Sequence, residues 1–273
     1  MSGRRVTYLE VGGLRIRAAV RGRGRPLLLV NGIGGNIEMW EPFEQALGGT
    51  SIQTITFDAP GAGESSGWAV PRRMCAIAKV IEGLLDQLSY DQVDTLGVSF
   101  GGALAQQFAR QSPERVRRLI LAATAPGVPG LGGVPGHPRA MLALATPRRY
   151  HDPEYLRSVA PAVYGGKIQK DPDLFAQQAH ARLLHPPSRG GYLAQMFAMT
   201  GWTNLPWLPF TRHRVLVLAG AHDPIVPALN GRILATLIPR AKLVIIPGGG
   251  HLFLLEQAAE SARHVVEFLA QPG

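Results

Sequence analysis

The chain carries the stretch Leu96-Gly97-Val98-Ser99-Phe100-Gly101-Gly102 between an apolar segment and a helix-forming one. Its Gly-x-Ser-x-Gly core predicts a sharp turn from a strand into a helix, with the serine hydroxyl pointing outward. Glycines on both sides of the serine allow the backbone to pack closely around a strained residue. Because a five-residue pattern of this kind is common by chance, its meaning depends on the residues that precede and follow it.

The length and composition indicate one large domain. A chain of 273 residues suits a single α/β domain with an insertion, and its 46% of hydrophobic residues suffices for a sizeable core. No apolar run approaches the roughly 18 residues of a membrane span, and no export signal follows Met1, so we expect a soluble, cytoplasmic protein. The single cysteine, Cys75, excludes an intrachain disulfide and a cysteine-based zinc site, and we expect it to be buried on a helix.

The positive charge is concentrated in one segment. The formal net charge is +9, and residues 126–212 carry nine Lys/Arg against four Asp/Glu. No nucleic-acid-binding motif accompanies these scattered arginines, which are typical of a solvated face. We therefore expect no nucleic-acid partner.

Strands and helices are expected to alternate along the chain. Alternating apolar residues predict an antiparallel hairpin, continuously apolar runs predict buried strands, and apolar spacings of three and four predict helices. The expected strands are 6–11, 14–20, 26–30, 51–57, 93–98, 119–123, 215–220 and 243–246, and the expected helices are 71–88, 103–110 and 229–238. This order indicates the α/β class, with a mostly parallel, doubly wound sheet of about eight strands that binds ligands at the strands' carboxyl ends.

The alternation breaks at Ala125. The segment 126–212 holds twelve of the 22 prolines and two of the four tryptophans, with helix-like stretches at 174–184 and 192–199. It is too long for a loop and too ordered in composition for a disordered linker. We expect a core of residues 1–125 and 213–273, with 126–212 inserted as a cap over the strand ends. An extra helical layer without a substrate role is the alternative.

Two polar residues follow the last two expected strands. Asp223 comes after the first of them, and His251 comes after the second on a run of glycines. Serine, acid and histidine in this chain order are typical of α/β-hydrolases. The pattern predicts that Ser99 attacks, that His251 acts as general base and then acid, and that Asp223 orients the imidazole. His222, beside Asp223, is a less favoured rival base.

A glycine-rich loop, Asn31-Gly32-Ile33-Gly34-Gly35, follows the expected strand 26–30. We expect the backbone N–H groups of Ile33 and Phe100 to bind the oxyanion of the reaction. Asp58, in the turn-rich loop after strand 51–57, is expected to brace backbone N–H groups. The sequence predicts no metal site.

Further stretches resemble those of intracellular medium-chain-length poly(3-hydroxyalkanoate) depolymerases. They are residues 31–34, 97–109, 147–150, 164–166, 201–203 and 250–254, so the resemblance spans nearly the whole chain, including the cap. It implies a serine-dependent, cofactor-free hydrolase that cleaves storage polyesters of 3-hydroxy acids through an acyl-enzyme, at granules inside bacteria. Phe100 replaces the tryptophan of that family, and Gly248-Gly249 replaces acidic residues, which bears on the chain-length preference.

The candidate substrate-pocket residues are Asn31, Tyr164, Phe197, Trp202 and Trp207. We expect the four aromatic side chains to line an acyl pocket or to touch the polymer, and the alternative is that they form the core of the cap. The basic excess of the cap favours contact with an anionic granule coat.

Other functions share this pattern. A carboxylesterase or lipase acting on small or lipid esters would carry the same triad, and a ligand-binding receptor of the same fold is the alternative from another class. Dehalogenases and epoxide hydrolases are disfavoured because they use aspartate where Ser99 stands. Cofactor-free oxygenases and hydroxynitrile lyases remain as minor alternatives, and the sequence leaves the oligomeric state open.

Overall fold

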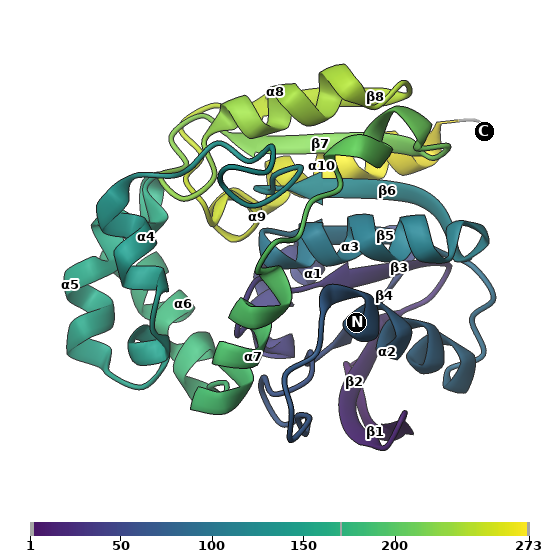
Figure 1. The fold of residues 1–273 in the computed structure, drawn as a ribbon, viewed down its shortest axis with the longest axis horizontal. Coiled ribbons are helices and arrows are strands. Elements are labelled where there is room, and N and C mark those ends of the chain that lie inside the picture. Colours follow the sequence, from purple (N-terminus) through teal and green to yellow (C-terminus); the bar gives the residue numbers. More distant parts are fainter. Residues whose placement is uncertain (1–2, 170, 272–273) are drawn as a thin grey trace.

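One central sheet organises the computed structural model, which describes residues 3–169 and 171–271 (Figure 1). Within these residues, eight strands lie in the order β1-β2-β4-β3-β5-β6-β7-β8. They are β1 (Arg5–Val11), β2 (Leu14–Gly22), β3 (Arg25–Val30), β4 (Ile52–Phe57), β5 (Val93–Val98), β6 (Val116–Ala122), β7 (Arg214–Gly220) and β8 (Ala241–Ile246). Strands β3 to β8 run parallel, and β2 pairs antiparallel with both β1 and β4. The expected mostly parallel α/β sheet is confirmed.

Helices cover both faces of this sheet. They are α1 (Glu41–Ala46), α2 (Met74–Gln87), α3 (Phe100–Gln111), α4 (Pro138–Leu144), α5 (Pro153–Tyr164), α6 (Pro172–Leu184), α7 (Arg189–Met199), α8 (Ala228–Leu237), α9 (Phe253–Glu256) and α10 (Ala258–Ala270). Short 3₁₀ helices are η1 (Ile37–Trp40), η2 (Pro113–Arg115), η3 (Pro147–Tyr150), η4 (Lys167–Gln169) and η5 (Leu205–Phe210). Helices α2, α3 and α8 pack on one face, and α1 and α10 pack on the other (Figure 1). In the described part of the chain, no helix is long and apolar enough to cross a membrane.

The apolar patterns explain the positions of the strands. β3, β5, β6 and β7 are buried along nearly their whole length, as continuously apolar strands covered on both faces should be. β1 instead alternates between exposed and partly buried residues at the edge of the sheet. The sheet therefore presents the ends of its buried parallel strands at one edge, where loops can carry functional side chains.

Between β6 and β7 the chain leaves the sheet and forms α4, α5, α6 and α7, which lie together beside the sheet (Figure 1). The sequence patterns predicted α6 and α7 but not α4 and α5. Helix α5 begins with a clear signal, because the side chain of Asp152 accepts a hydrogen bond from the backbone N–H of Tyr155 and Pro153 occupies the first turn. An aspartate-proline pair was therefore a missed helix start.

Cys75 lies exposed on α2, so the expectation that it is buried is wrong. The buried face of α2 includes Met74, Ile77 and Ile81, at the helical spacings of three and four residues. Cys75 follows Met74 by one residue, which turns its side chain about 100° away from that face. The local helix was predicted correctly, but the burial of this one position was not.

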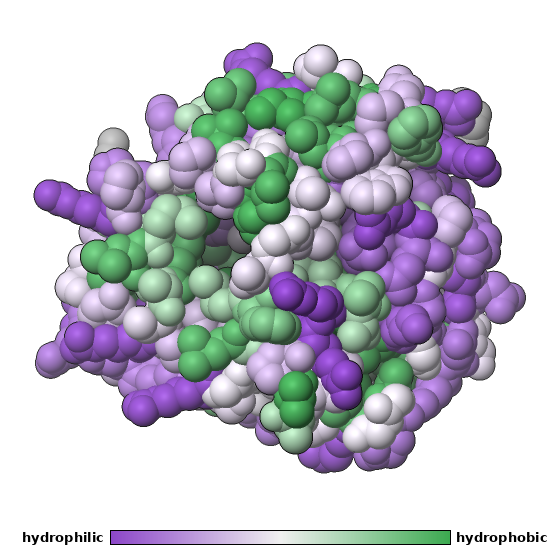
Figure 2. All heavy atoms as spheres, in the orientation of Figure 1, coloured by the Kyte–Doolittle hydropathy of each residue, from purple (hydrophilic) through white to green (hydrophobic). Residues whose placement is uncertain are grey.

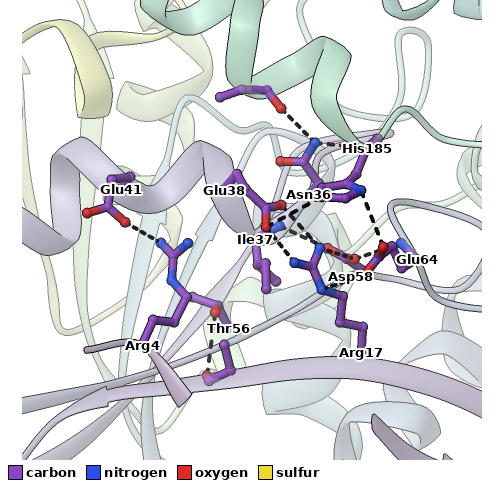
Figure 3. Close-up of polar contacts among 12 residues, drawn as sticks. Arg4, Arg17, Asn36, Ile37, Glu38, Glu41, Thr56, Asp58, Glu64 and His185 are labelled. Atoms are coloured by element: carbon purple, nitrogen blue, oxygen red, sulfur yellow. Dashed lines mark hydrogen bonds and ion pairs between the residues drawn. The ribbon is translucent and has the colours of Figure 1, made fainter. Parts of the chain in front are cut away.

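Asp58 braces two loops beside the strand ends (Figure 3). Its Oδ1 accepts the backbone N–H of Ile37 at 2.8 Å, its Oδ2 accepts that of Glu64 at 2.9 Å, and Arg17 Nη1 lies 3.4 Å from Oδ2. These contacts fit the structural role expected for this residue. Burial raises the pKa of the Asp58 carboxyl to about 6, although the hydrogen bond from Glu64, the charge of Arg17 and the hydrogen bond from Ile37 oppose the shift.

This raised pKa predicts how Asp58→Asn changes the pH dependence of stability. Because the folded protein takes up this proton at a higher pH than the unfolded chain, acidification stabilises the folded state through Asp58. The unfolding free energy of the wild type relative to the variant should rise by roughly 2 kcal/mol between about pH 8 and about pH 4. Urea denaturation of both proteins measures this difference, and a difference that stays flat or falls on acidification would contradict it.

Candidate active site

Ser99 occupies the turn between β5 and α3 in a strained backbone conformation. Its φ is +56° and its ψ is −119°, outside the ordinary regions for a residue with a side chain. The turn is held by its own backbone, since the Ser99 N–H donates to Ala122 O at 3.0 Å and its carbonyl accepts the N–H of Gly102 at 2.9 Å. Thr124 Oγ1 donates to the same carbonyl at 2.8 Å.

The two glycines of the motif are required by close backbone packing. A Cβ at Gly97 would lie 2.2 Å from the carbonyl oxygen of Gly101, and a Cβ at Gly101 would lie 2.1 Å from that of Val30. No other residue has room at either position. A Cβ at Gly32 would lie 3.6 Å from the Cβ of Ser99, so the loop after β3 runs directly beside the serine.

His251 and Asp223 are joined by a buried contact. His251 Nδ1 lies 2.8 Å from Asp223 Oδ2, and Asp223 Oδ1 accepts the backbone N–H groups of Ile225 and Val226, each at 2.9 Å. The carboxylate therefore holds the imidazole through Nδ1 and leaves Nε2 to face another group. The backbone N–H of His251 donates to Tyr164 O at 2.6 Å, which ties the histidine loop to the end of α5.

The loop after β3 is anchored from the inserted helices. Tyr150 OH donates to the Ile33 carbonyl, and the N–H of Gly34 donates to Gln195 Oε1 at 2.8 Å. Over residues 3–169 and 171–271, neither the Ile33 N–H nor the Phe100 N–H donates to a protein acceptor. Both donors expected for an oxyanion hole are thus unpaired in the protein. Sequence reasoning missed the anchoring roles of Tyr150 and Gln195, which depend on contacts between distant segments.

Two cavities meet at Ser99. The larger, of about 450 Å³, is lined by Ser99 and Phe100 together with apolar side chains of the inserted segment, among them Met141, Met196 and Trp202. The smaller, of about 80 Å³, is lined by Ser99 and His251 and by several polar side chains. Ile33, Ser99, Leu144 and Ile225 line both cavities. The serine therefore lies at the junction of a large apolar space and a small one that arginine and tyrosine side chains help to line.

The candidate pocket residues do not all lie at the same cavity. Asn31 and Tyr164 line the smaller cavity, and Trp202 lines the larger one. Phe197 and Trp207 are not among the residues that line these two cavities, and their expected contact with the polymer stays a prediction. Phe197 is 40% exposed beneath the Arg73 guanidinium, and Trp207 is 46% exposed beneath that of Arg110.

Two further titratable residues lie near the candidate site: His222 is exposed, and Glu256 is partly buried. His222 is exposed, and its neighbour Asp223 contacts His251 instead. Burial raises the pKa of the Glu256 carboxyl to about 7, while hydrogen bonds from the N–H groups of Lys167 and Ile168 and the charge of His251 lower it. This second carboxyl near His251 was not signalled by any motif.

Among the described residues, no group of three or more His, Cys, Asp or Glu side chains could hold a metal ion.

Comparison with known proteins identifies the family. The family described as alpha/beta hydrolase fold matches residues 25–258. The chain therefore belongs to the α/β-hydrolase family, as the strand order and the turn at Ser99 indicate.

Within this family, the chain is similar to a poly(3-hydroxyalkanoate) depolymerase of Ectopseudomonas oleovorans, at 45% identity over 266 residues, 96% of this chain and 92% of that protein. A 2-hydroxy-6-oxo-6-phenylhexa-2,4-dienoate hydrolase of Burkholderia cepacia is 27% identical over 277 residues, covering 97% and 95%. The crystal structure of an enol-lactonase from Burkholderia xenovorans LB400 superposes with a TM-score of 0.83 at 23% identity, covering 97% of this chain and 100% of that one. The last similarity concerns the fold alone.

The contact between Asp223 and His251 predicts a large loss of turnover in Asp223→Asn. An asparagine amide in place of Oδ2 would favour the wrong imidazole tautomer, which lowers kcat by roughly 10⁴-fold in comparable triads. Hydrolysis of p-nitrophenyl butanoate measures the effect. His222→Ala is the matched control, because it removes the exposed neighbouring imidazole and should leave kcat within about twofold. A large loss in His222→Ala with little loss in Asp223→Asn would reverse the assignment.

Proposed function

We propose that this hydrolase cleaves the carboxylic ester bonds of a poly(3-hydroxyalkanoate) storage polyester, with Ser99, His251 and Asp223 as its catalytic triad. The observation that carries the proposal is the position of Ser99, which lies at the junction of two cavities and shares the smaller one with the Asp223-bound His251. The 45% identity to a depolymerase over nearly the whole chain supports the choice of substrate.

The proposed reaction proceeds through an acyl-enzyme. Ser99 Oγ attacks the ester carbonyl carbon while His251 Nε2 takes the hydroxyl proton, and the oxyanion is bound by the N–H groups of Ile33 and Phe100. The C–O bond to the leaving alkoxide then breaks, and His251 returns the proton to that oxygen. Water, deprotonated by His251, cleaves the acyl-Ser99 ester, which releases the acid and restores the serine. Asp223 stabilises the imidazolium in both steps.

The larger cavity suits an alkyl side chain. Its space of about 450 Å³ is bounded mainly by apolar atoms. Burial of each additional methylene there contributes about 0.8 kcal/mol. A medium-length alkyl side chain on the 3-hydroxy acid therefore gains more from this cavity than a methyl group does.

We further propose that residues 126–212 form a cap on a core of residues 1–125 and 213–273. An isolated bridge between Gly127 and Thr203 joins the two ends of this segment. Side chains from its helices line both cavities at Ser99. These contacts argue for a substrate role rather than for a separate helical layer.

The substrate proposal predicts an order of rates on three substrates. At equal enzyme concentration, a medium-chain polyhydroxyalkanoate latex should be degraded at least about tenfold faster than a poly(3-hydroxybutyrate) latex, because of the apolar cavity. Release of 3-hydroxy acids, measured by chromatography, reports the rates, and p-nitrophenyl butanoate reports the triad separately. Ser99→Ala should abolish all three activities.

Two outcomes would redirect the proposal. Turnover of the soluble ester without degradation of either latex would indicate a carboxylesterase or lipase with the same triad. Tight binding of esters by the wild type without any turnover would indicate a ligand-binding protein.

Contact with the polymer surface is also proposed, through exposed apolar side chains on α4 and α7. Leu142 on α4 is 76% exposed and Leu193 on α7 is 54% exposed, and their neighbours Met141 and Met196 line the larger cavity. Figure 2 shows hydrophobic residues gathered on the left of the molecule, where Figure 1 places α4. Exposed apolar side chains beside a cavity are suited to an insoluble apolar surface. Cytoplasmic granules of the polymer would provide that surface.

The double variant Leu142→Asp/Leu193→Asp tests this contact. Two charges facing the polymer should lower the ratio of latex degradation to p-nitrophenyl butanoate turnover by at least about tenfold. Leu229→Asp is the matched control, because Leu229 is 52% exposed on α8, outside the segment 126–212. An unchanged ratio in the double variant would remove this surface from polymer binding.

A further inference from the structure

The buried arginines of this protein fall into two kinds. Arg17, Arg118, Arg149 and Arg182 are each at least 94% buried. Arg17 is paired with three carboxylates (Figure 3), and Arg118 donates to backbone carbonyls at the end of α10. A buried guanidinium requires such partners, because an unpaired buried charge is costly.

Arg149 and Arg182 are paired differently, and Arg149 Nη1 donates to one backbone carbonyl, that of Thr146, at 3.5 Å. Within the described residues, no carboxylate forms an ion pair with either of them. Arg149 Nη1 donates to Tyr192 OH at 2.8 Å and Arg182 Nη1 to Tyr150 OH at 3.3 Å, while Arg149 Nε and Arg182 Nη2 are buried with no acceptor. The two guanidinium carbons lie 4.7 and 5.2 Å from the centre of the same Tyr150 ring. Two positive charges are thus held near each other, and each guanidinium has an N–H group without an acceptor.

The side chains that carry these unpaired donors take part in the wall of the smaller cavity. Arg149 and Arg182 line it together with Ser99 and His251. Tyr164, which also lines it, has a buried hydroxyl without a hydrogen-bond partner. A space of about 80 Å³ that is lined by two arginine side chains and by no Asp or Glu among the described residues is suited to a small anion with several acceptor oxygens.

We propose that Arg149 and Arg182 bind the free carboxylate of the leaving hydroxy acid, so that the enzyme prefers ester bonds next to a carboxyl chain end. His251 decides which cavity holds the leaving unit. It must protonate the leaving oxygen, and of the two cavities it lines only the smaller one. The acyl part then occupies the larger apolar cavity. In a polyester of 3-hydroxy acids, the carboxylate of a terminal leaving unit is separated from the scissile oxygen by only two carbons. This inference rests on the proposed function.

A pair of two-unit oligoesters of 3-hydroxyoctanoate tests the inference, one with a free carboxylate and the other its methyl ester. The wild type should cleave the free acid with a kcat/KM about 10- to 100-fold higher than that of the methyl ester, as charge-assisted hydrogen bonds provide. In Arg182→Gln this ratio should fall to near one, and Arg182→Lys should retain part of it. The ratio within each protein cancels any general loss of activity.

Arg157→Gln is the matched control, because it removes one positive charge from an exposed position on α5 and should preserve the ratio. Should Arg182→Gln fail to fold, the wild type alone decides the matter. Its inhibition by 3-hydroxyoctanoate should be at least about tenfold tighter than its inhibition by 3-hydroxyoctanamide, which has the same shape without the charge.

The possible results separate this inference from the proposed function. Equal cleavage of free acid and methyl ester, or equal inhibition by acid and amide, would overturn the carboxylate site while latex degradation still supported a depolymerase. A strong preference for the free acid without degradation of any latex would support the site and overturn the polymer substrate. An equal fall of the ratio in Arg157→Gln and Arg182→Gln would show that general charge attracts the substrate, which would overturn the role of the cavity.

Discussion

The close backbone packing around Ser99 is the constraint on which the site depends. The serine keeps a positive φ because β3, β5 and α3 meet there with no space for a Cβ at Gly97 or Gly101. This packing also sets the loop after β3 beside the serine. Strain at one residue is tolerated because the surrounding sheet and helix over-determine its conformation. The exposed hydroxyl and the neighbouring N–H groups are consequences of the same arrangement.

The inserted helices divide the space above this turn into two unlike parts. Apolar side chains of the segment bound the larger cavity, whereas Arg149 and Arg182 bring charge to the smaller one. The inserted segment also holds the loops that carry the candidate site. The Tyr150 hydroxyl donates a hydrogen bond to the Ile33 carbonyl, and the His251 N–H donates one to the Tyr164 carbonyl. A movement of the inserted segment would therefore displace the oxyanion loop and the histidine together. The proposed substrate cavities and the proposed triad are therefore held by the same helices.

Much of the core was predictable because its signals are local. Continuous apolar runs gave the parallel strands, and the chain order of Ser99, Asp223 and His251 after those strands predicted which loops would meet. Helix starts were predicted less accurately, since α2 begins at Met74 rather than Pro71 and the Asp152-Pro153 start of α5 was missed. The catalytic roles themselves stay predictions, although the contact of Asp223 with His251 agrees with them.

Local patterns along the chain were enough for the class of fold, the serine turn and the candidate triad, because strand ends of a parallel sheet necessarily gather at one edge. Only the tertiary structure decided which aromatic residues face the cavities and which, like Phe197 and Trp207, lie at the surface. It alone distinguished Arg17, matched by carboxylates, from Arg149 and Arg182, which are not. The physical reason is that burial and charge pairing depend on residues far apart in the sequence, which no spacing within one segment records.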